Sequence, residues 1–566
     1  MKLLENSGIS KPIQQSATLL ALWILSFSLL WATYSQEIDM LFWLAIISAF
    51  SATVFGIKSN LPEGAKIFTV IILLFFERAI IFAHIPYWGY SAYQWDAMFN
   101  LQLSEIIKEN GRWMIEVGTV FARSYSYNPA MHLWCVAVNL ASKVDLFEVS
   151  LIFSFLSGAL TLVFYYLAIR YLAGEKIAIW AALIYSINQT FVFFDHYVME
   201  SYGLVFYSMF MYILFRKIDL KSKGSVLYVI GLLASFAISF SHVWTTINLL
   251  ILWFAMLLFV KLYSLLMGLK HKNHFSIPFM LASCSILLIW TLTFAYPYID
   301  RQINLIIELF YSLLAGRPSY RGQLGGLSLF ERAITYLGQA IPLIIGASRL
   351  RNDVIRRRKS EILIFLDAWF IFSVLFLVLG TFFAPVNIVG EGNIARRSWE
   401  FAYFGISPLV ALGLHNEKNH GGNGDLSKRL SLDKLRYAFL ILTLISINLM
   451  YPDYYVPEYS YRNSAFWVRR YMPGVNVTLD LTSCGTILSY GRTHIGPYSN
   501  LLEIMYSPSN YTSEFYLPIL DKVAICKKIV MWHPQSTSNL SFYDYSFDRI
   551  FDSPTISIYE KGRLRL

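Results

Sequence analysis

Ionisable side chains are scarce in this chain, and those that could do chemistry lie at the ends of long apolar runs. Asp96 lies in the aromatic stretch YWGYSAYQWDAMFN (residues 87–100), and Arg396 and Arg397 precede the apolar run 399–414. A carboxylate can remove a proton from an attacking hydroxyl group, and arginine can bind a phosphate through paired, charge-assisted hydrogen bonds. The other polar side chains near run ends are Glu77, Arg78, Asp195, His196, Glu200, His242, Asp300 and Glu400.

The composition indicates a membrane protein. Of 566 residues, 56% are hydrophobic and only 14% are charged, whereas a soluble domain carries about 25% charged residues. The net charge of +10 does not indicate nucleic-acid binding, because Lys and Arg are expected in the cytoplasmic loops of a membrane protein.

The chain contains about 13 apolar runs that approach the roughly 20 residues needed to cross a bilayer. The first run is expected to be a retained anchor rather than a removed signal peptide, since no small-residue cleavage site follows it. The predicted spans are 18–34, 40–57, 66–84, 147–171, 177–194, 200–215, 225–241, 244–264, 276–297, 334–349, 361–384, 399–414 and 436–451.

The distribution of Lys and Arg predicts the orientation. With the N-terminus in the cytoplasm, the basic clusters at 349–359 and 418–436 lie inside, whereas the short turns 35–39 and 195–199 lie outside and carry acids but no Lys or Arg. This pattern follows the positive-inside rule. An odd number of spans then places the C-terminus outside a multi-pass protein of the cell membrane.

The expected fold class is a polytopic α-helical membrane protein with a small extracytoplasmic α/β domain. Residues 1–451 are predicted to form the transmembrane domain, with large outer loops at 85–146, which holds Asp96, and at 298–333. Residues 452–566 are predicted to form the C-terminal domain, because short strand-like segments there alternate with Gly, Asn, Ser and Pro.

The first outer loop is predicted to contain an interfacial helix that Asp96 heads. From residue 97 onward, apolar residues at 99, 103, 106 and 107 occupy one helical face and polar residues the other, as in a helix that lies in the membrane surface. Asp96 could simply cap this helix, since Asp is a favoured N-cap worth about 1 kcal/mol. Capping and catalysis do not exclude each other.

On the predicted topology, the ionisable groups near run ends gather at the outer lipid–water boundary. A transporter is expected to place its polar groups near the midplane instead, often where helices break. The outer boundary is where a membrane enzyme would meet both a lipid phosphate and a water-soluble acceptor.

The segment YNPAMHLWCVAVNLASKVDLFEVSLIFSFLSGALTLVFYYLAIRYLAGEK resembles an outer helix and the spanning helix after it in the GT-C superfamily of membrane glycosyltransferases. The similarity is greatest to the archaeal, protein O-mannosyltransferase and aminoarabinose-transferase branches of that family. The segments ESYGLVFYSMFMYILFRK, ARRSWEFAYFGISPLVALGL and FDRIFDSPTISIYEKG resemble the second-acid segment, the outer arginine and the closing strands. The matching residues in the first segment are Pro129, His132, Tyr166, Arg170 and Gly174.

The resemblance implies transfer of a sugar from a polyprenyl (dolichyl) phosphate to a glycan, lipid-linked or protein acceptor on the outer face. It assigns Asp96 as the general base, or as a ligand of a divalent metal (Mg or Mn) in metal-dependent branches, and Glu200 as the second acid. Arg396 and Arg397 would hold the lipid phosphate, as could His242 and Arg321, while Asp195 and His196 could contact the acceptor or a metal. Each has a plainer alternative: a solvated turn for the acids, an interfacial side chain for His242, and contact with lipid headgroups for the arginines.

Two other functions are considered. The chain could be a flippase or transporter of lipid-linked oligosaccharides, which polar groups at the midplane would favour. It could also be a non-catalytic assembly factor, in which Asp96 and Arg397 would be individually dispensable.

Overall fold

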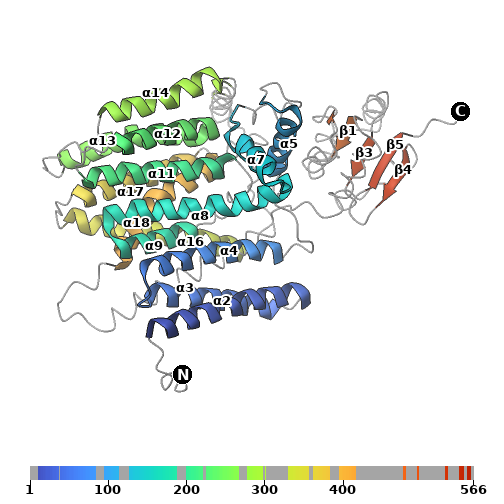
Figure 1. Ribbon diagram of the computed structural model, residues 1–566. Coiled ribbons are helices and arrows are strands. Elements are labelled where there is room, and N and C mark those ends of the chain that lie inside the picture. Colours follow the sequence, from blue (N-terminus) through green and yellow to red (C-terminus); the bar gives the residue numbers. More distant parts are fainter. Residues whose placement is uncertain are drawn as a thin grey trace. The chain divides into compact units, whose positions relative to one another are not determined.

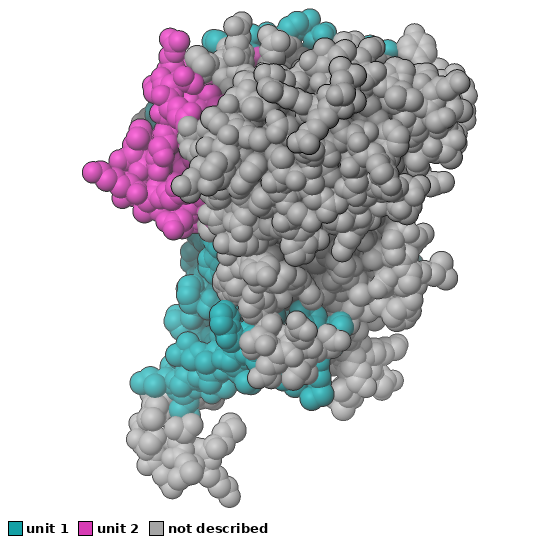
Figure 2. All heavy atoms as spheres, turned by 90° about the vertical axis from the view of Figure 1, so that its right-hand side faces the viewer, with its two compact units in different colours: residues 1–86, 155–195, 200–453 teal, residues 87–154, 196–199, 454–566 magenta. Residues whose placement is uncertain are grey.

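The computed structural model describes most of the predicted membrane helices and five short strands. The described residues are 11–36, 39–83, 95–113, 127–187, 199–220, 225–266, 277–296, 300, 307, 329–355, 361–382, 394–415, 476–479, 494–495, 529–532, 547–552 and 557–561. They fall into two compact units (Figure 2): unit 1 comprises residues 1–86, 155–195 and 200–453, and unit 2 comprises residues 87–154, 196–199 and 454–566.

Unit 1 is helical, and its helices lie side by side (Figure 1). It holds α2 (Lys11–Gln36), α3 (Asp39–Lys58), α4 (Glu63–Ala83), most of α8 (Leu146–Ala173), α9 (Glu175–Ser186), α11 (Met199–Leu220), α12 (Ser225–Ser241), α13 (Val243–Leu266), α14 (Ile277–Thr293), α16 (Leu329–Ile355), α17 (Glu361–Phe382) and α18 (Ile394–His415).

Three described segments are long and apolar enough to cross a membrane: Pro12–Ala32, Met40–Lys58 and Leu146–Ala173. At 1.5 Å per residue even the shortest of them extends about 28 Å, close to the thickness of the hydrocarbon core. With the shorter apolar helices around them, these segments form a polytopic helical membrane fold.

Two predicted spans differ from the observed helices. The run 177–194 was expected to form one span, but α9 ends at Ser186 and covers only the first part of this run; residues 188–194 lie outside the described residues. The predicted span 399–414 belongs to α18, which already begins at Ile394. Arg396 and Arg397 therefore lie inside the helix rather than in a loop before it.

An aromatic cluster holds α18 in the middle of unit 1. The ring of Phe404 lies 5.0 Å from the ring of Tyr165, 4.5 Å from that of Tyr185 and 4.9 Å from that of Tyr207. The Tyr165 hydroxyl also donates a 3.0 Å hydrogen bond to the Phe404 carbonyl oxygen. These contacts fix α18 against α8, α9 and α11.

Unit 2 contains two helices from the region 85–146, which was predicted to be an outer loop. Helix α5 (Trp95–Asn110) occupies the position of the predicted interfacial helix and is followed by Gly111, whose φ of +66° suits glycine. Helix α7 (Ala130–Ser142) follows Pro129 and ends before Lys143, whose N–H bonds to the Asn139 carbonyl oxygen. At 13 residues α7 is about 20 Å long, shorter than the three described segments that could cross a membrane.

The described strands of unit 2 form one mixed sheet in the order β2-β1-β3-β5-β4. Strand β1 pairs in parallel with β2 and β3, whereas β5 pairs antiparallel with β3 and β4. All five strands lie within residues 452–566, where short strand-like segments were expected. The bounds are β1 (Asn476–Leu479), β2 (His494–Ile495), β3 (Ile529–Trp532), β4 (Phe547–Asp552) and β5 (Ser557–Lys561).

Candidate functional site

Four of the predicted site residues lie in the first turns of their helices. Asp96 is the second residue of α5, Glu200 is the second residue of α11, and Arg396 and Arg397 are the third and fourth residues of α18. His242 lies between α12 and α13. Asp195, His196 and Arg321 lie outside the described residues.

The first turn of α18 concentrates positive charge. It contains Arg396 and Arg397 and no acidic residue. A helix N-terminus already carries a partial positive charge, so cations there are destabilising by about 0.3–1 kcal/mol each, whereas anions are stabilised. The two arginines therefore destabilise the helix in the free protein. A bound anion such as a phosphate would offset this destabilisation.

His242 caps helix α13 with its ring. Its Nδ1 accepts the backbone N–H of Thr245 at 3.3 Å and lies 2.8 Å from the Thr245 hydroxyl oxygen. Because Nδ1 is an acceptor, the neutral ring carries its proton on Nε2. His242 is 6% exposed, so its ring is held in one orientation with an N–H donor at Nε2.

Gly203 brings α11 close to this His242 turn. A Cβ atom at residue 203 would lie 2.9 Å from the Thr245 hydroxyl oxygen and 3.3 Å from the His242 Cβ. Glu200 precedes Gly203 by three residues and so lies on the same face of α11. The structure therefore brings Glu200, which is 4% exposed, and His242 to neighbouring positions in unit 1.

The same face of α11 also meets α18. Tyr207, seven residues after Glu200, contacts the rings of Phe401 and Phe404 at 5.4 and 4.9 Å. Arg397 stands seven residues before Phe404. Glu200 therefore lies two helical turns before Tyr207 in α11, and Arg397 lies two turns before Phe404 in α18. The two residues precede the same interhelical contact by equal lengths of helix.

In unit 2, three polar residues join α5 to α7. The Nδ1 atom of His132 in α7 lies 3.2 Å from the Ser104 hydroxyl oxygen in α5, and this hydroxyl bonds to the Asn100 carbonyl oxygen at 2.9 Å. All three residues are fully buried. Burial lowers the pKa of His132 from 6.5 to about 3, although a hydrogen bond to the Asn100 backbone opposes this shift.

Sequence reasoning missed the partners of the predicted residues. Nothing in the chain marks Gly203 as a neighbour of His242, because this contact depends on which helices pack together. Thr245 follows His242 by three residues, so its contact with the ring is local. Asn100 and Ser104 could have been noticed from their spacing, since they follow Asp96 by four and eight residues and lie on one helical face with it.

The family motif of Tyr166 and Arg170 forms a separate cluster. Arg170 Nε lies 2.8 Å from Glu63 Oε1, and the Tyr166 hydroxyl donates to the same oxygen. Arg170 stands 24 residues after the start of α8, about 36 Å along the helix. These motif residues therefore tie α8 to α4 and do not join the predicted catalytic groups.

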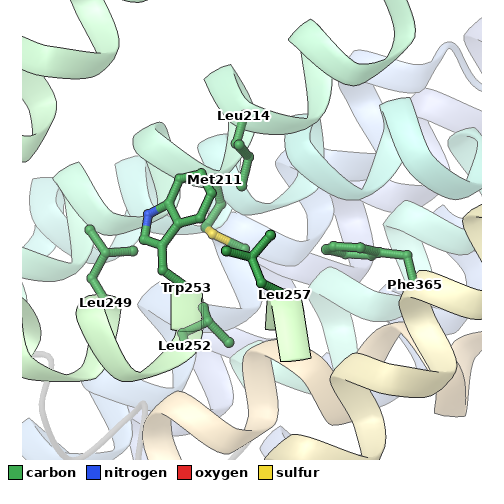
Figure 3. A pocket seen from close by; sticks show the side chains of 7 residues that line it. All are labelled: Met211, Leu214, Leu249, Leu252, Trp253, Leu257 and Phe365. Carbon is green, nitrogen blue, oxygen red and sulfur yellow. The ribbon is translucent and has the colours of Figure 1, made fainter. Parts of the chain in front are cut away.

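A pocket in unit 1 does not include any predicted site residue. It lies between α11, α13 and α17 and is lined by apolar side chains that include Met211, Trp253 and Phe365 (Figure 3). Without a charged side chain, this pocket suits neither a phosphate nor a metal ion. Among the described residues, no group of three or more His, Cys, Asp or Glu side chains could hold a metal.

Comparison with known proteins gives no sequence relative. No protein-family model matches the chain, and no curated protein matches it.

Solved structures show the likeness instead. The chain is similar to ArnT from Cupriavidus metallidurans bound to undecaprenyl phosphate, at 11% identity and a TM-score of 0.49, over 83% of this chain and 94% of ArnT. It is also similar to the Archaeoglobus fulgidus oligosaccharyltransferase in complex with zinc and sulfate, at 13% identity and a TM-score of 0.50, over 82% of this chain and 68% of that one. The same oligosaccharyltransferase tethered to an acceptor peptide with the NVT sequon matches at 11% identity and a TM-score of 0.49, over 88% and 74%.

One of these neighbours supports the class of fold. The chain shares a polytopic helical membrane fold with the oligosaccharyltransferase in complex with zinc and sulfate, in agreement with the helical membrane fold expected from the sequence. At 13% identity the likeness concerns the fold alone.

Proposed function

We propose that the chain is a membrane glycosyltransferase that transfers a sugar from a polyprenyl-phosphate donor to an acceptor on the extracytoplasmic face. The observation that carries this proposal is the first turn of α18, where Arg396 and Arg397 stand with no acidic residue. Two guanidinium groups at a helix N-terminus are suited to a phosphate. The likeness in fold to the Archaeoglobus fulgidus oligosaccharyltransferase, at a TM-score of 0.50, supports it.

In the proposed reaction an acceptor hydroxyl oxygen attacks the anomeric carbon of the donor sugar. The new glycosidic bond forms as the bond from that carbon to the phosphate oxygen breaks, and Asp96 takes the hydroxyl proton. Arg397, with Arg396 beside it, stabilises the negative charge on the departing polyprenyl phosphate. Donor and acceptor supply every atom of the products, and the proton that Asp96 takes comes from the acceptor hydroxyl.

Glu200 and His242 are proposed to orient the reactants. Both α11 and α18 start on the outer face in the predicted topology, so the contact of Tyr207 with Phe404 would place Glu200 and Arg397 at one level. The Nε2–H of neutral His242 is then a donor for a phosphate or sugar oxygen. Asp195, His196 and Arg321 are proposed to complete the site, and a divalent metal, Mg or Mn, would be held by its acids.

The topology of about 13 spans, the cytoplasmic N-terminus and the extracytoplasmic C-terminal domain at 452–566 are part of the same proposal. That domain would help to recognise the glycan or protein acceptor. An archaeal cell membrane and a dolichyl phosphate donor fit the family branches that the sequence resembles.

A strain that lacks the gene tests the proposed function. We expect its surface glycan to lose one sugar and the corresponding polyprenyl-phosphate sugar to accumulate on the outer face of the membrane. Restoring the gene should reverse both changes. An unchanged glycan mass profile would contradict the proposal.

One observation favours transport as a second candidate function. Glu77 is fully buried within α4, and neither of its carboxyl oxygens has a hydrogen-bond partner among the described residues. Ionisable groups in spanning helices often mark a transport path. A transporter would instead leave the lipid-linked sugar on the cytoplasmic face of the deletion strain.

A further inference from the structure

The contact between α5 and α7 depends on a chain of three buried polar groups. His132 Nδ1 lies 3.2 Å from the Ser104 hydroxyl oxygen, which in turn lies 2.9 Å from the Asn100 carbonyl oxygen. A buried polar group that loses its hydrogen-bond partner destabilises the fold. The two helices therefore have one favoured register, in which the imidazole meets Ser104.

This register also fixes the position of Asp96. Asp96, Asn100 and Ser104 follow one another at intervals of four residues in α5, so the three positions lie along one face of the helix. Asn100 and Ser104 are fully buried, and the Ser104 end of the face is held by His132. A shift of α5 on α7 would displace Asp96 with it.

The imidazole serves this contact in its neutral form. The Ser104 hydroxyl donates a hydrogen bond to the Asn100 carbonyl oxygen. Its oxygen is therefore the acceptor in the contact with His132, and the His132 Nδ1–H is the donor. The Nε2 atom then bears a lone pair, is buried, and has no hydrogen-bond partner within the described part of the chain. A fully buried ring with this arrangement is suited to hold a helix rather than to exchange protons with a substrate.

We infer that His132 is a positioning residue that fixes α5 on α7 and thereby places Asp96 for proton removal. The inference rests on the proposed function for its catalytic part, whereas the effect on α5 can be measured without any activity. It assigns a role to the histidine of the outer-helix motif, which the proposed reaction leaves unused.

Three variants of the full chain test the inference. His132→Leu removes the bond to Ser104, His132→Asn keeps an N–H donor near the position of Nδ1, and Ser104→Ala removes the partner. Ser154→Ala is the matched control, because the Ser154 hydroxyl makes a comparable 3.0 Å bond to the Ser150 carbonyl oxygen in α8.

Hydrogen exchange and kinetics give independent readings. We expect His132→Leu and Ser104→Ala to speed amide exchange across residues 95–110, and to lower kcat about 10- to 100-fold with little change in KM. His132→Asn should restore slow exchange and most of kcat, and Ser154→Ala should change neither. Adding His132→Leu to Asp96→Asn should cause no further loss of kcat.

Two results would overturn the inference. Unchanged exchange of the α5 amides in His132→Leu would show that the histidine does not hold the helix. An equal loss of kcat in the presence and absence of the Asp96 carboxylate would show that it acts by another route. If the wild-type protein transferred no sugar while α5 loosened in His132→Leu, the proposed function would fail and the helix contact would stand.

Discussion

Arg170 Nε in α8 lies 2.8 Å from Glu63 Oε1 in α4, and the Tyr166 hydroxyl donates to the same carboxylate oxygen. Glu63 begins α4, whose other end leads to the outer loop that contains Asp96, and Arg170 lies near the end of α8, which follows that loop. In the predicted topology the cluster lies on the cytoplasmic side. It ties together the two helices that flank the first outer loop.

We expect reversal of either charge in this cluster to destabilise the fold without affecting chemistry. Glu63→Lys or Arg170→Glu should each lower the free energy of unfolding by about 1 kcal/mol, a modest value because Arg170 is 46% exposed. The double variant should recover most of that loss. Thermal unfolding of the purified variants measures the stability, and kcat per folded molecule should remain that of the wild type. Additive losses in the double variant would show that the pair does not interact.

Gly203→Ala should disturb the His242 turn. The new methyl group would lie 2.9 Å from the Thr245 hydroxyl oxygen, too close without a shift of the group that bonds to His242. Overpacking typically costs about 1–3 kcal/mol, against a gain in helix propensity of about 1 kcal/mol for Ala over Gly. We expect a net loss of stability together with a fall in sugar transfer, measured by thermal unfolding and by kcat.

Gly64→Ala is the matched control for this variant. No atom lies within 4 Å of the position that a Cβ would take at residue 64 in the first turn of α4, so the substitution should raise stability by about 0.5 kcal/mol through helix propensity. If Gly203→Ala behaved like Gly64→Ala, the close approach of α11 to the His242 turn would be refuted.

Apolar patterning predicted several of the helices closely. The predicted span 225–241 has the bounds of α12, and the predicted span 147–171 lies within α8, because a continuous apolar run of this length is stable in lipid only as a helix. The run 177–194 continues past Ser186, where α9 ends. Hydropathy alone does not mark a break within an apolar run.

The site was predicted as residue types but not as neighbours. Charge scarcity singled out Glu200 and His242, yet their proximity depends on Gly203, a small residue whose role appears only when α11 meets the turn before α13. Likewise, the predicted apolar face of α5 was incomplete: Asn100 and Ser104 are buried beside Leu103 and Ile107. Polar side chains can lie in such a face when their hydrogen bonds are made there.

Stability should fall in mild acid because of His132. Its pKa is lowered from 6.5 to about 3 in the folded protein by burial, so below pH 6.5 the unfolded chain binds a proton that the folded chain does not. The free energy of unfolding therefore decreases as the pH falls from 6.5 toward 3, by up to about 1.4 kcal/mol per pH unit.

The His132→Asn variant isolates this effect. It cannot take up the proton, so the difference in unfolding free energy between wild type and variant should shift by about 2 kcal/mol between pH 6.5 and pH 5, in favour of the variant at low pH. Thermal unfolding at several pH values measures it. A difference that stays constant with pH would mean that the folded protein accommodates a charged His132.

Sugar transfer by the Asp96→Asn variant tests the central proposal most directly. Purified protein is incubated with a polyprenyl-phosphate sugar and with surface glycan from the deletion strain, and the gain of one sugar is followed by mass spectrometry. Asp145→Asn is the matched control, because the Asp145 carboxylate accepts the Phe147 N–H at 2.9 Å at the start of α8 and Asn caps a helix equally well. We predict that wild type and Asp145→Asn transfer the sugar, while Asp96→Asn is slower by about 100-fold or more. Transfer by Asp96→Asn at the wild-type rate would contradict the role of Asp96 as the base.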